Sequence, residues 1–233
     1  MRTGAWRGRL KAVPGLVRRV EPRSKLVSQS IELPSGELRL LQPQESAELP
    51  DAAAVEWAPI APYWSVLWRS GVALACELEG VALRGLRVVE LGCGLAVPSI
   101  AAARRGAAVL ATDACADALA LVARNAHLND VRIETATVNW AKPDELVRRA
   151  PFDLVLAADV LYEPASIPLL LSLLPRLAPE AWLADPGRPA TVAFLEQAGY
   201  RWPIETRDRD LVLLHRLQFG LNAVGQSAQL APR

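Results

Sequence analysis

One stretch, residues 87–98, constrains the fold of this chain more than any other. A short apolar and β-branched run ends there at Gly92, a second glycine follows at Gly94, and an alanine-rich segment with helical spacing comes next. This order is typical of a buried strand, a tight turn and the first turn of a helix. Glycines let a backbone approach a ligand closely, and a helix N-terminus presents unpaired N–H groups. We therefore predict a ligand-binding turn at these two glycines.

The rest of the chain after this turn alternates between strand and helix patterns. The predicted strands are 87–91, 107–112, 131–138, 153–158, 182–184, 201–206 and 210–216. The predicted helices are 97–105, 116–128, 141–149, 164–177 and 189–198. Nearly continuous apolar strands separated by helices indicate an α/β fold, a doubly wound and mostly parallel seven-stranded sheet with helices on both faces. The last two strands have no helix between them, which predicts an antiparallel C-terminal strand.

The N-terminal part is predicted to form an extension of this domain. Alternating segments on either side of a Pro-Ser-Gly turn favour a small β-hairpin within 26–43, followed by a polar loop. A cluster of tryptophans then leads into a helix at 65–78. The domain organisation that follows is a basic arm at 1–25, the hairpin and its loop at 26–56, the main domain at 57–218 and a C-terminal tail at 219–233.

The basic arm carries most of the charge asymmetry of the chain. Residues 2–25 hold eight Lys and Arg against one Glu, although the net charge of all 233 residues is only +1. A solvated tail accounts for this composition, and a docking arm for nucleic acid or for an acidic protein surface is the alternative. The small net charge gives no global reason for a polyanionic partner, so we do not expect a nucleic-acid partner for the domain.

The cysteine and histidine pattern argues against a metal site. Cys76, Cys93 and Cys115 lack metal-ligand spacing, and the two histidines stand far apart in the sequence. Unpaired cysteines fit a reducing compartment. No stretch approaches the roughly 20 apolar residues of a membrane span, and the N-terminus lacks a signal-peptide core. We therefore expect a monomeric, cytoplasmic protein with no membrane partner.

An acid at the end of the second strand predicts the kind of ligand that the turn binds. Asp113 follows Gly94 by 19 positions, and a carboxylate at this edge of an α/β sheet meets the hydroxyls of a ribose. Dinucleotide-binding turns have a third glycine where this chain has Val97. Glu90 lies two residues before the first glycine, where a carboxylate suits a cationic ligand better than a pyrophosphate. These features point to S-adenosylmethionine, which carries sulfonium and ammonium groups and no phosphate.

The sequence also resembles a known family over roughly residues 26–216. Glu90-Leu-Gly-Cys-Gly94 is similar to motif I of the seven-strand, Rossmann-like methyltransferases, and Ala158-Asp-Val-Leu-Tyr162 resembles the D-x-x-Y motif of the methyltransferase-like protein lysine methyltransferases, methyltransferase family 16. This resemblance implies transfer of a methyl group from S-adenosylmethionine to a lysine of a protein substrate. It implies cofactor binding by residues around the glycine turn: Trp68, Glu90, Gly92, Cys93, Gly94, Asp113, Trp140 and Ala158.

The resemblance also implies roles on the acceptor side. The Asp159 carboxylate is expected to anchor the lysine ammonium and take part in its deprotonation, and the Tyr162 hydroxyl to orient the same nitrogen. A helix N-cap is the structural alternative for Asp159, although Pro164 suits a helix that begins later. The substrate-binding residues are expected to be Trp64, Asp185 and Arg188, from the tryptophan segment and from an Asp-Pro-Gly-Arg sequence similar to the electron-transfer-flavoprotein β-subunit lysine methyltransferases. For the last two, a simple turn and ion pair is the alternative.

Two departures from the family pattern bear on these expectations. Ala96 stands where motif I usually has a third glycine, and because alanine favours a negative φ we expect a slightly wider turn. Val160 and Leu161 replace prolines found in enzymes that methylate nucleobase amines, which counts against that class. The alternatives left open are a small-molecule N-methyltransferase, a non-catalytic binding protein of the same fold and, more distantly, an NAD-linked oxidoreductase.

Overall fold

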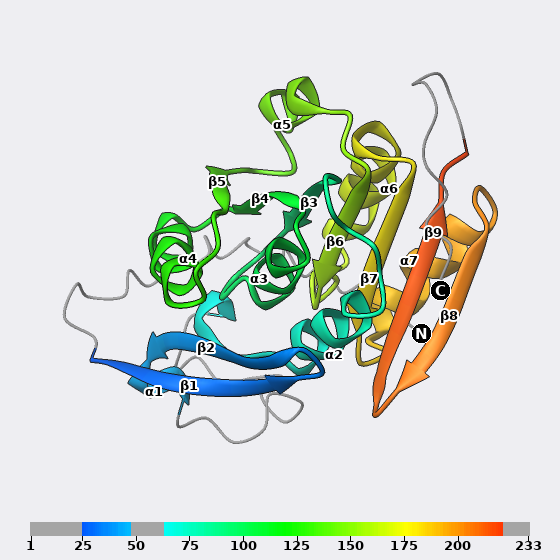
Figure 1. Cartoon of the computed structure of the whole chain (residues 1–233). Helices are drawn as coiled ribbons and strands as arrows, with labels where there is room; N and C mark the ends of the chain where they lie inside the picture. The colour runs from blue at the N-terminus through cyan, green and yellow to red at the C-terminus, as the bar shows by residue number, and fades with distance from the viewer. Residues whose placement is uncertain (1–24, 48–62, 221–233) are drawn as a thin grey trace, which may run out of the picture.

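The computed structural model describes residues 25–47 and 63–220. Within these ranges the chain forms one mixed sheet covered by helices, with a two-stranded hairpin beside it (Figure 1). The basic arm up to residue 24, the end of the polar loop with the first tryptophans at 48–62, and the tail beyond residue 220 lie outside the described residues. No helix in the described ranges is long and apolar enough to cross a membrane.

The central sheet confirms the predicted fold class. Its strands lie in the order β5-β4-β3-β6-β7-β9-β8, and all neighbours are parallel except that β9 runs antiparallel to both β7 and β8. The strands are β3 (Arg87–Leu91), β4 (Ala108–Asp113), β5 (Glu134–Thr137), β6 (Leu154–Ala158), β7 (Glu180–Asp185), β8 (Ile204–Arg209) and β9 (Val212–Gln218). The direction of strand order reverses between β3 and β6. Such a switch point opens a crevice at the carboxyl ends of the strands.

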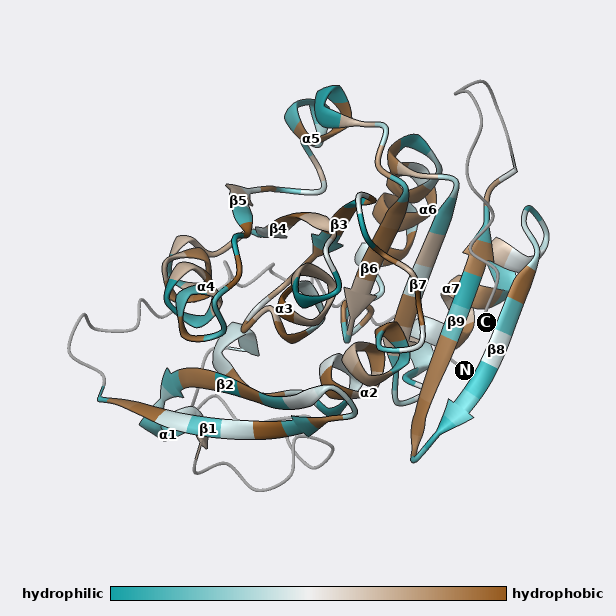
Figure 2. Cartoon of the chain, in the orientation of Figure 1, coloured by the Kyte–Doolittle hydropathy of each residue, from teal (hydrophilic) through white to brown (hydrophobic). Residues whose placement is uncertain are grey.

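Helices cover both faces of the sheet because the central strands carry buried, mostly apolar side chains on both sides. Along β6, Leu154 and Leu156 pack in a cluster with α2, whereas Val155 and Ala157 pack in a cluster with α6 and α7. Figure 2 shows this hydrophobic character along β6 and the hydrophilic character of the edge strand β8. The helices are α2 (Arg69–Leu78), α3 (Val97–Arg104) and α4 (Ala116–Leu128) on one face, and α5 (Asp144–Arg149), α6 (Ser166–Leu177) and α7 (Pro189–Gly199) on the other.

The predicted hairpin is present as β1 (Leu26–Leu33) and β2 (Gly36–Pro43), paired antiparallel throughout. The prediction of a loop after the hairpin is wrong for four residues, which form the helical turn α1 (Gln44–Ala47). The backbone N–H of Gln44 donates to the carbonyl of Lys25 at 2.9 Å, which closes this turn onto the start of β1. The helix expected from residue 65 begins later, at Arg69, after the 3-10 turn η2 (Tyr63–Ser65).

Two asparagines, one in α4 and one at its C-cap, attach the hairpin to the domain. Leu41 donates its N–H to Asn125 Oδ1 at 2.8 Å, and Asn125 Nδ2 donates to the Leu41 carbonyl at 3.2 Å. Asn129, one helical turn later, forms the same pair of bonds with the N–H and carbonyl of Arg39, at 3.0 and 2.7 Å. The two side-chain amides therefore take the place of a neighbouring strand along the outer edge of β2, so its buried backbone groups are paired. An apolar cluster that includes Leu38, Leu40 and residues of α2 and α3 fills the space behind them.

Candidate active site

The glycine turn joins β3 to α3 with a backbone in the left-handed region at alternate residues. Gly92 has φ 63°, Gly94 has φ 49° and Ala96 has φ 61°. The expected negative φ at Ala96 is wrong, since this alanine adopts the conformation that a third glycine would adopt. A buried left-handed alanine costs about 1–2 kcal/mol. Its N–H donates to the Cys93 carbonyl at 2.6 Å, and its side chain is fully buried in a cluster that includes Ala111.

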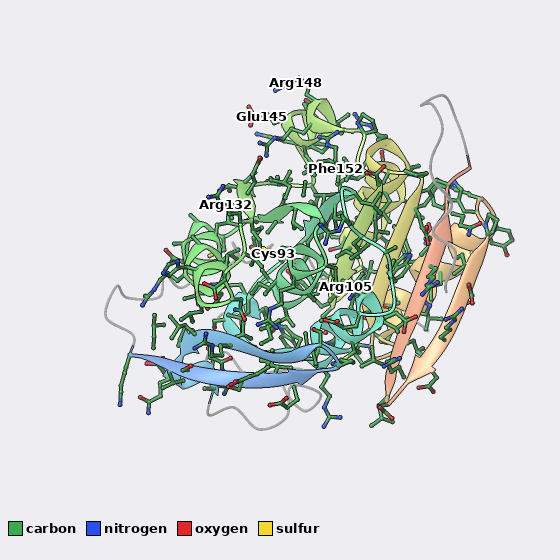
Figure 3. The ribbon with its side chains drawn as sticks, viewed as in Figure 1. Cys93, Arg105, Arg132, Glu145, Arg148 and Phe152 are labelled. Carbon is green, nitrogen blue, oxygen red and sulfur yellow. The ribbon has the colours of Figure 1, made fainter. Side chains whose placement is uncertain are left out.

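Close packing explains why the turn needs glycine at its second position. A Cβ on Gly94 would lie 2.8 Å from the backbone oxygen of Trp64, which is closer than real Cβ contacts come. A Cβ on Gly92 would lie 3.1 Å from Val160 Cγ1 and 3.5 Å from a ring carbon of Trp140. The turn is thus held between the segment that precedes α2 and the residues that follow β5 and β6. Cys93, in the middle of the turn, lies buried in the interior of the domain near α3 (Figure 3).

Asp113, the last residue of β4, is fixed directly against the turn. Its Oδ2 accepts the N–H of Gly94 at 3.0 Å, and its Oδ1 accepts the N–H of Cys115 at 2.9 Å. Burial raises the pKa of this carboxyl, and the backbone N–H groups oppose that rise. Each carboxylate oxygen keeps a lone pair for another donor, so the residue remains able to accept hydroxyl groups of a ligand.

Glu90 lies inside β3 and is almost completely buried. Its Oε2 accepts the backbone N–H of Ser99 at 2.9 Å and the hydroxyl of the same residue, so it also satisfies a donor in the first turn of α3. Burial raises the pKa of Glu90 to about 8, and the nearby Asp113 carboxylate adds to the rise. Because this pKa is near neutral pH, a cation bound next to Glu90 would shift the carboxyl from its neutral to its ionised form.

The predicted site residues surround one cavity of about 770 Å³ at the carboxyl ends of the strands. All eight residues predicted to bind the cofactor line it, and so do Asp159, Tyr162, Trp64 and Arg188. Asp185 is the exception among the predicted residues, because it lies behind Arg188 and outside the lining.

The charges of this cavity fit a cationic ligand. The acids that line it are Glu90, Asp113, Asp159 and Glu163, and among the described lining residues Arg188 is the sole basic side chain. Within residues 25–47 and 63–220, neither lysine nor arginine lines the glycine turn itself, so this part of the chain offers no side-chain cation there for a pyrophosphate. The volume lies within the roughly 300–1,000 Å³ typical of small-molecule sites. These residues fit S-adenosylmethionine better than a dinucleotide.

Asp159 follows the last residue of β6 in a left-handed conformation, with φ 54°. Its backbone N–H donates to the carbonyl of Ala184 at 2.9 Å, which ties this strained residue to the end of β7. The N-cap of α6 is Ala165, so the N-cap alternative for Asp159 is excluded. Three residues later Tyr162 stands at the cavity with its side chain 54% exposed, and its ring centroid lies 5.6 Å from that of Tyr63.

The Asp159 carboxylate already has a cationic partner. Arg188 places a terminal guanidinium nitrogen 3.0 Å from Asp159 Oδ1, and the guanidinium carbon lies 5.7 Å from the ring centroid of Trp68. Burial raises the pKa of Asp159, while hydrogen bonds from Ser70 and Arg188 oppose the rise. Asp185 Oδ1 accepts the backbone N–H groups of Gly187 and Arg188, both at 2.7 Å. The turn that was the alternative interpretation of the Asp-Pro-Gly-Arg sequence therefore does form.

Sequence reasoning missed three contacts at this end of the cavity. Tyr63 was not among the predicted site residues, although it pairs with Tyr162 and its carbonyl accepts the Trp68 indole N–H at 2.9 Å. Ser70 has no sequence signal that names Asp159 as its partner. The pairing of Arg188 with Asp159 joins residues 29 positions apart, in the segments that follow two neighbouring strands, which no local pattern reports.

Comparison with known proteins gives the following relationships. The family model described as lysine methyltransferase matches residues 63–181. Protein N-lysine methyltransferase METTL21A of Danio rerio is 34% identical over 121 residues, which cover 49% of this chain and 55% of that protein. The electron transfer flavoprotein beta subunit lysine methyltransferase of Mus musculus is 30% identical over 186 residues, which cover 73% of this chain and 68% of that protein. The chain thus spans between about half and two thirds of the length of these relatives.

Solved structures show the same fold at low identity. The T. thermophilus 16S rRNA methyltransferase RsmC, solved with AdoMet and guanosine, superimposes with a TM-score of 0.58 at 15% identity. The superposition covers 83% of this chain and 50% of that one.

Proposed function

The chain belongs to the S-adenosylmethionine-dependent lysine methyltransferase family, and we propose that it methylates the side-chain nitrogen of a lysine in a protein substrate. One observation carries this proposal. A single cavity joins the glycine turn and Asp113, which suit the cofactor, to Asp159 and Tyr162, which suit an amine. The two groups come from opposite sides of the switch point between β3 and β6, where an α/β sheet binds its ligands.

The cofactor would be held by side chains that are already fixed. Asp113 would accept ribose hydroxyls with the lone pairs that the Gly94 and Cys115 N–H groups leave free. The Trp140 ring would offer an apolar surface, and the Glu90 carboxyl would face a positive ligand group. When bound, S-adenosylmethionine supplies a methyl group that its sulfonium has already activated. The protein therefore has mainly to align the acceptor nitrogen with that group.

The acceptor nitrogen would be positioned by Asp159 and Tyr162. A lysine ammonium has no lone pair, so it must lose a proton before it can act as a nucleophile. The Asp159 carboxylate would attract the ammonium to the cavity, and the Tyr162 hydroxyl would then direct the free amine. Trp64 would line the path of the aliphatic part of the lysine.

Methyl transfer into a lysate of the source organism tests this function. The purified protein is incubated with S-adenosylmethionine that carries a radiolabelled methyl group, and labelled proteins are separated and mapped by mass spectrometry. We expect a labelled protein whose modification maps to lysine. Label found only in the small-molecule fraction would contradict the proposal and favour a small-molecule N-methyltransferase.

Asp159→Asn provides the matched variant for this assay. The change removes the negative charge at nearly constant shape, so we expect at least a 100-fold loss of methyl transfer with binding of S-adenosylhomocysteine retained. Calorimetric titration measures the binding. Asp208→Asn, an exposed acid of β8, makes the same chemical change away from the cavity and should keep full activity. Full activity of Asp159→Asn would remove this residue from the mechanism.

A further inference from the structure

Arg188 links two buried carboxylates that come from neighbouring strands. One guanidinium nitrogen is 3.0 Å from Asp159 Oδ1, and Nε is 3.8 Å from Asp185 Oδ2. The exposed fractions of the three side chains are 16% for Arg188, 7% for Asp159 and 3% for Asp185. Asp159 follows β6 and Asp185 ends β7, so the three groups form a short row across the carboxyl ends of two adjacent parallel strands.

The guanidinium is held in place from several sides. Asp185 accepts the backbone N–H groups of Gly187 and Arg188, which fixes the loop from which the side chain starts. Arg188 is also the N-cap residue of α7, and Pro189 begins that helix. The face of the Trp68 indole lies next to the guanidinium, with 5.7 Å between the guanidinium carbon and the ring centroid, and this cation–π contact further restricts the guanidinium. This arrangement describes a fixed structural cation.

The charges of Asp159, Arg188 and Asp185 do not balance. Two carboxylates and one guanidinium leave one net negative charge in a buried place, and buried charges are stable only when paired. Asp185 Oδ2 and Arg188 Nε also have no hydrogen-bond partner among the described residues. A further cation at the Asp159 end would complete the pairing, and the ammonium of a substrate lysine has that charge.

On the basis of the proposed function, we propose that Arg188 is a positioning residue that keeps Asp159 ionised and directed at the acceptor end of the cavity. Asp159 then acts as a fixed anion that attracts the substrate ammonium, and the proton of that ammonium leaves to solvent water. In this proposal Arg188 acts on the reaction through Asp159, and Asp185 holds Arg188 in position.

The groups around Asp159 support these roles of Arg188 and Asp185. Burial alone favours the neutral carboxyl, and the groups that oppose it are the Ser70 hydroxyl from α2 and the Arg188 guanidinium from the N-cap of α7. Asp185, behind Arg188, acts in the opposite direction by its negative charge. His215 on β9 is buried next to Thr206, and burial lowers its pKa, so it adds no positive charge to this region at neutral pH. Arg188 is therefore the one described full cation facing Asp159.

Carboxyl titration by NMR tests the role of Arg188 without any need for activity. Aspartate is labelled with ¹³C at the side-chain carboxyl, and the Asp159 signal is identified by its absence in Asp159→Asn. We expect Asp159 to be ionised at pH 7 in the wild-type protein, and its titration midpoint to rise by about one pH unit or more in Arg188→Gln. Arg188→Lys keeps the charge and should retain a midpoint close to that of the wild type.

The control and the contradicting outcomes are defined in the same experiment. Arg132→Gln makes the same change at an exposed position between α4 and β5 and should leave the midpoint unchanged (Figure 3). An unchanged midpoint in folded Arg188→Gln would overturn the proposal. A wild-type Asp159 that is protonated at pH 7 would overturn it as well, and this result does not depend on the folding of any variant.

A pH–rate profile then connects the charge to turnover. In Arg188→Gln we expect the acid limb of kcat/KM to move to higher pH together with the Asp159 midpoint, so that methyl transfer at a pH below both midpoints falls about tenfold for each pH unit of that rise. Binding of S-adenosylhomocysteine should stay the same. If the midpoint moves while the wild-type protein methylates no protein lysine, the role of Arg188 stands and the proposed function fails. If the wild-type protein methylates a protein lysine and the Asp159 midpoint does not move in Arg188→Gln, the proposed function stands and the role of Arg188 fails.

Discussion

Glu90 places a carboxyl group in a buried strand, where the N–H and hydroxyl of Ser99 donate to it. An apolar residue at this position would leave that helix N–H without its partner, so the acid stabilises the start of α3 even in its neutral form. The cavity that Glu90 lines on its other side is the one that suits a cation. A single side chain thus contributes both to the fold and to the choice of ligand.

The raised pKa of Glu90 predicts a pH dependence of stability. Burial moves the pKa from 4.5 to about 8, so between these values the folded protein keeps a proton that the unfolded chain has lost. The contribution of Glu90 to the free energy of unfolding therefore decreases as the pH rises from about 4.5 to about 8 and is constant above. Urea unfolding at about pH 5.5 and pH 8 should show a smaller decrease in Glu90→Gln than in the wild type. Equal decreases in both proteins would show that Glu90 does not titrate in this range.

At Gly94 we expect an added side-chain atom to lower both stability and cofactor affinity. The added Cβ of Gly94→Ala meets the Trp64 backbone oxygen at 2.8 Å and requires a left-handed alanine. We expect a loss of about 2 kcal/mol or more in the free energy of unfolding and a weakened affinity for S-adenosylhomocysteine. Thermal unfolding and calorimetry measure the two effects. Gly199→Ala, where nothing lies within 4 Å of the new Cβ, is the control and should change neither.

At the scale of elements, local pattern predicts most of this structure. The strand at 87–91 and the helix at 116–128 are found with the predicted bounds, and the sheet, its antiparallel end and the hairpin are confirmed. These elements follow from hydrophobic period and from glycine and proline positions, which are properties of neighbouring residues. The left-handed Ala96 was not predictable in this way, because its conformation is stabilised by the surrounding packing. The bond between Arg188 and Asp159 depends on which strands become neighbours.

The attachment of the hairpin is the clearest contact that no local pattern reveals. Asn125 lies in α4, which is otherwise apolar on its buried side, and Asn129 is the C-cap of that helix; their bonds reach residues more than 80 positions earlier. Asn125→Ala leaves the N–H and carbonyl of Leu41 without these partners, so we expect a loss of about 1–3 kcal/mol in the free energy of unfolding. Urea unfolding measures it, with the exposed Arg124→Ala on the same helix as the control. An equal effect of the two changes would show that the asparagine amides do not hold the hairpin.

At the scale of the whole molecule, charge is distributed locally and the net charge says little about function. The chain carries a formal charge of only +1, yet its main cavity is lined by four acids and one arginine. Narrow cavities with one sign of charge concentrate the field, so the preference for cations belongs to the cavity and not to the surface as a whole. The exposed pair of Glu145 and Arg148 on α5, by contrast, is open to solvent and screened (Figure 3).

The switch point also divides the sequence into two stretches with different tasks. Most of the residues suited to the methyl donor lie between Glu90 and Trp140, whereas most of those suited to the acceptor lie between Asp159 and Arg188, on the other side of the β3–β6 boundary. Changes in the later stretch can therefore alter which substrate is accepted while the donor site stays intact. In terms of evolution and engineering, this fold is modular. On the proposed function, we expect a new specificity to need changes mainly in this later stretch and at Trp64, without a redesign of the cofactor site.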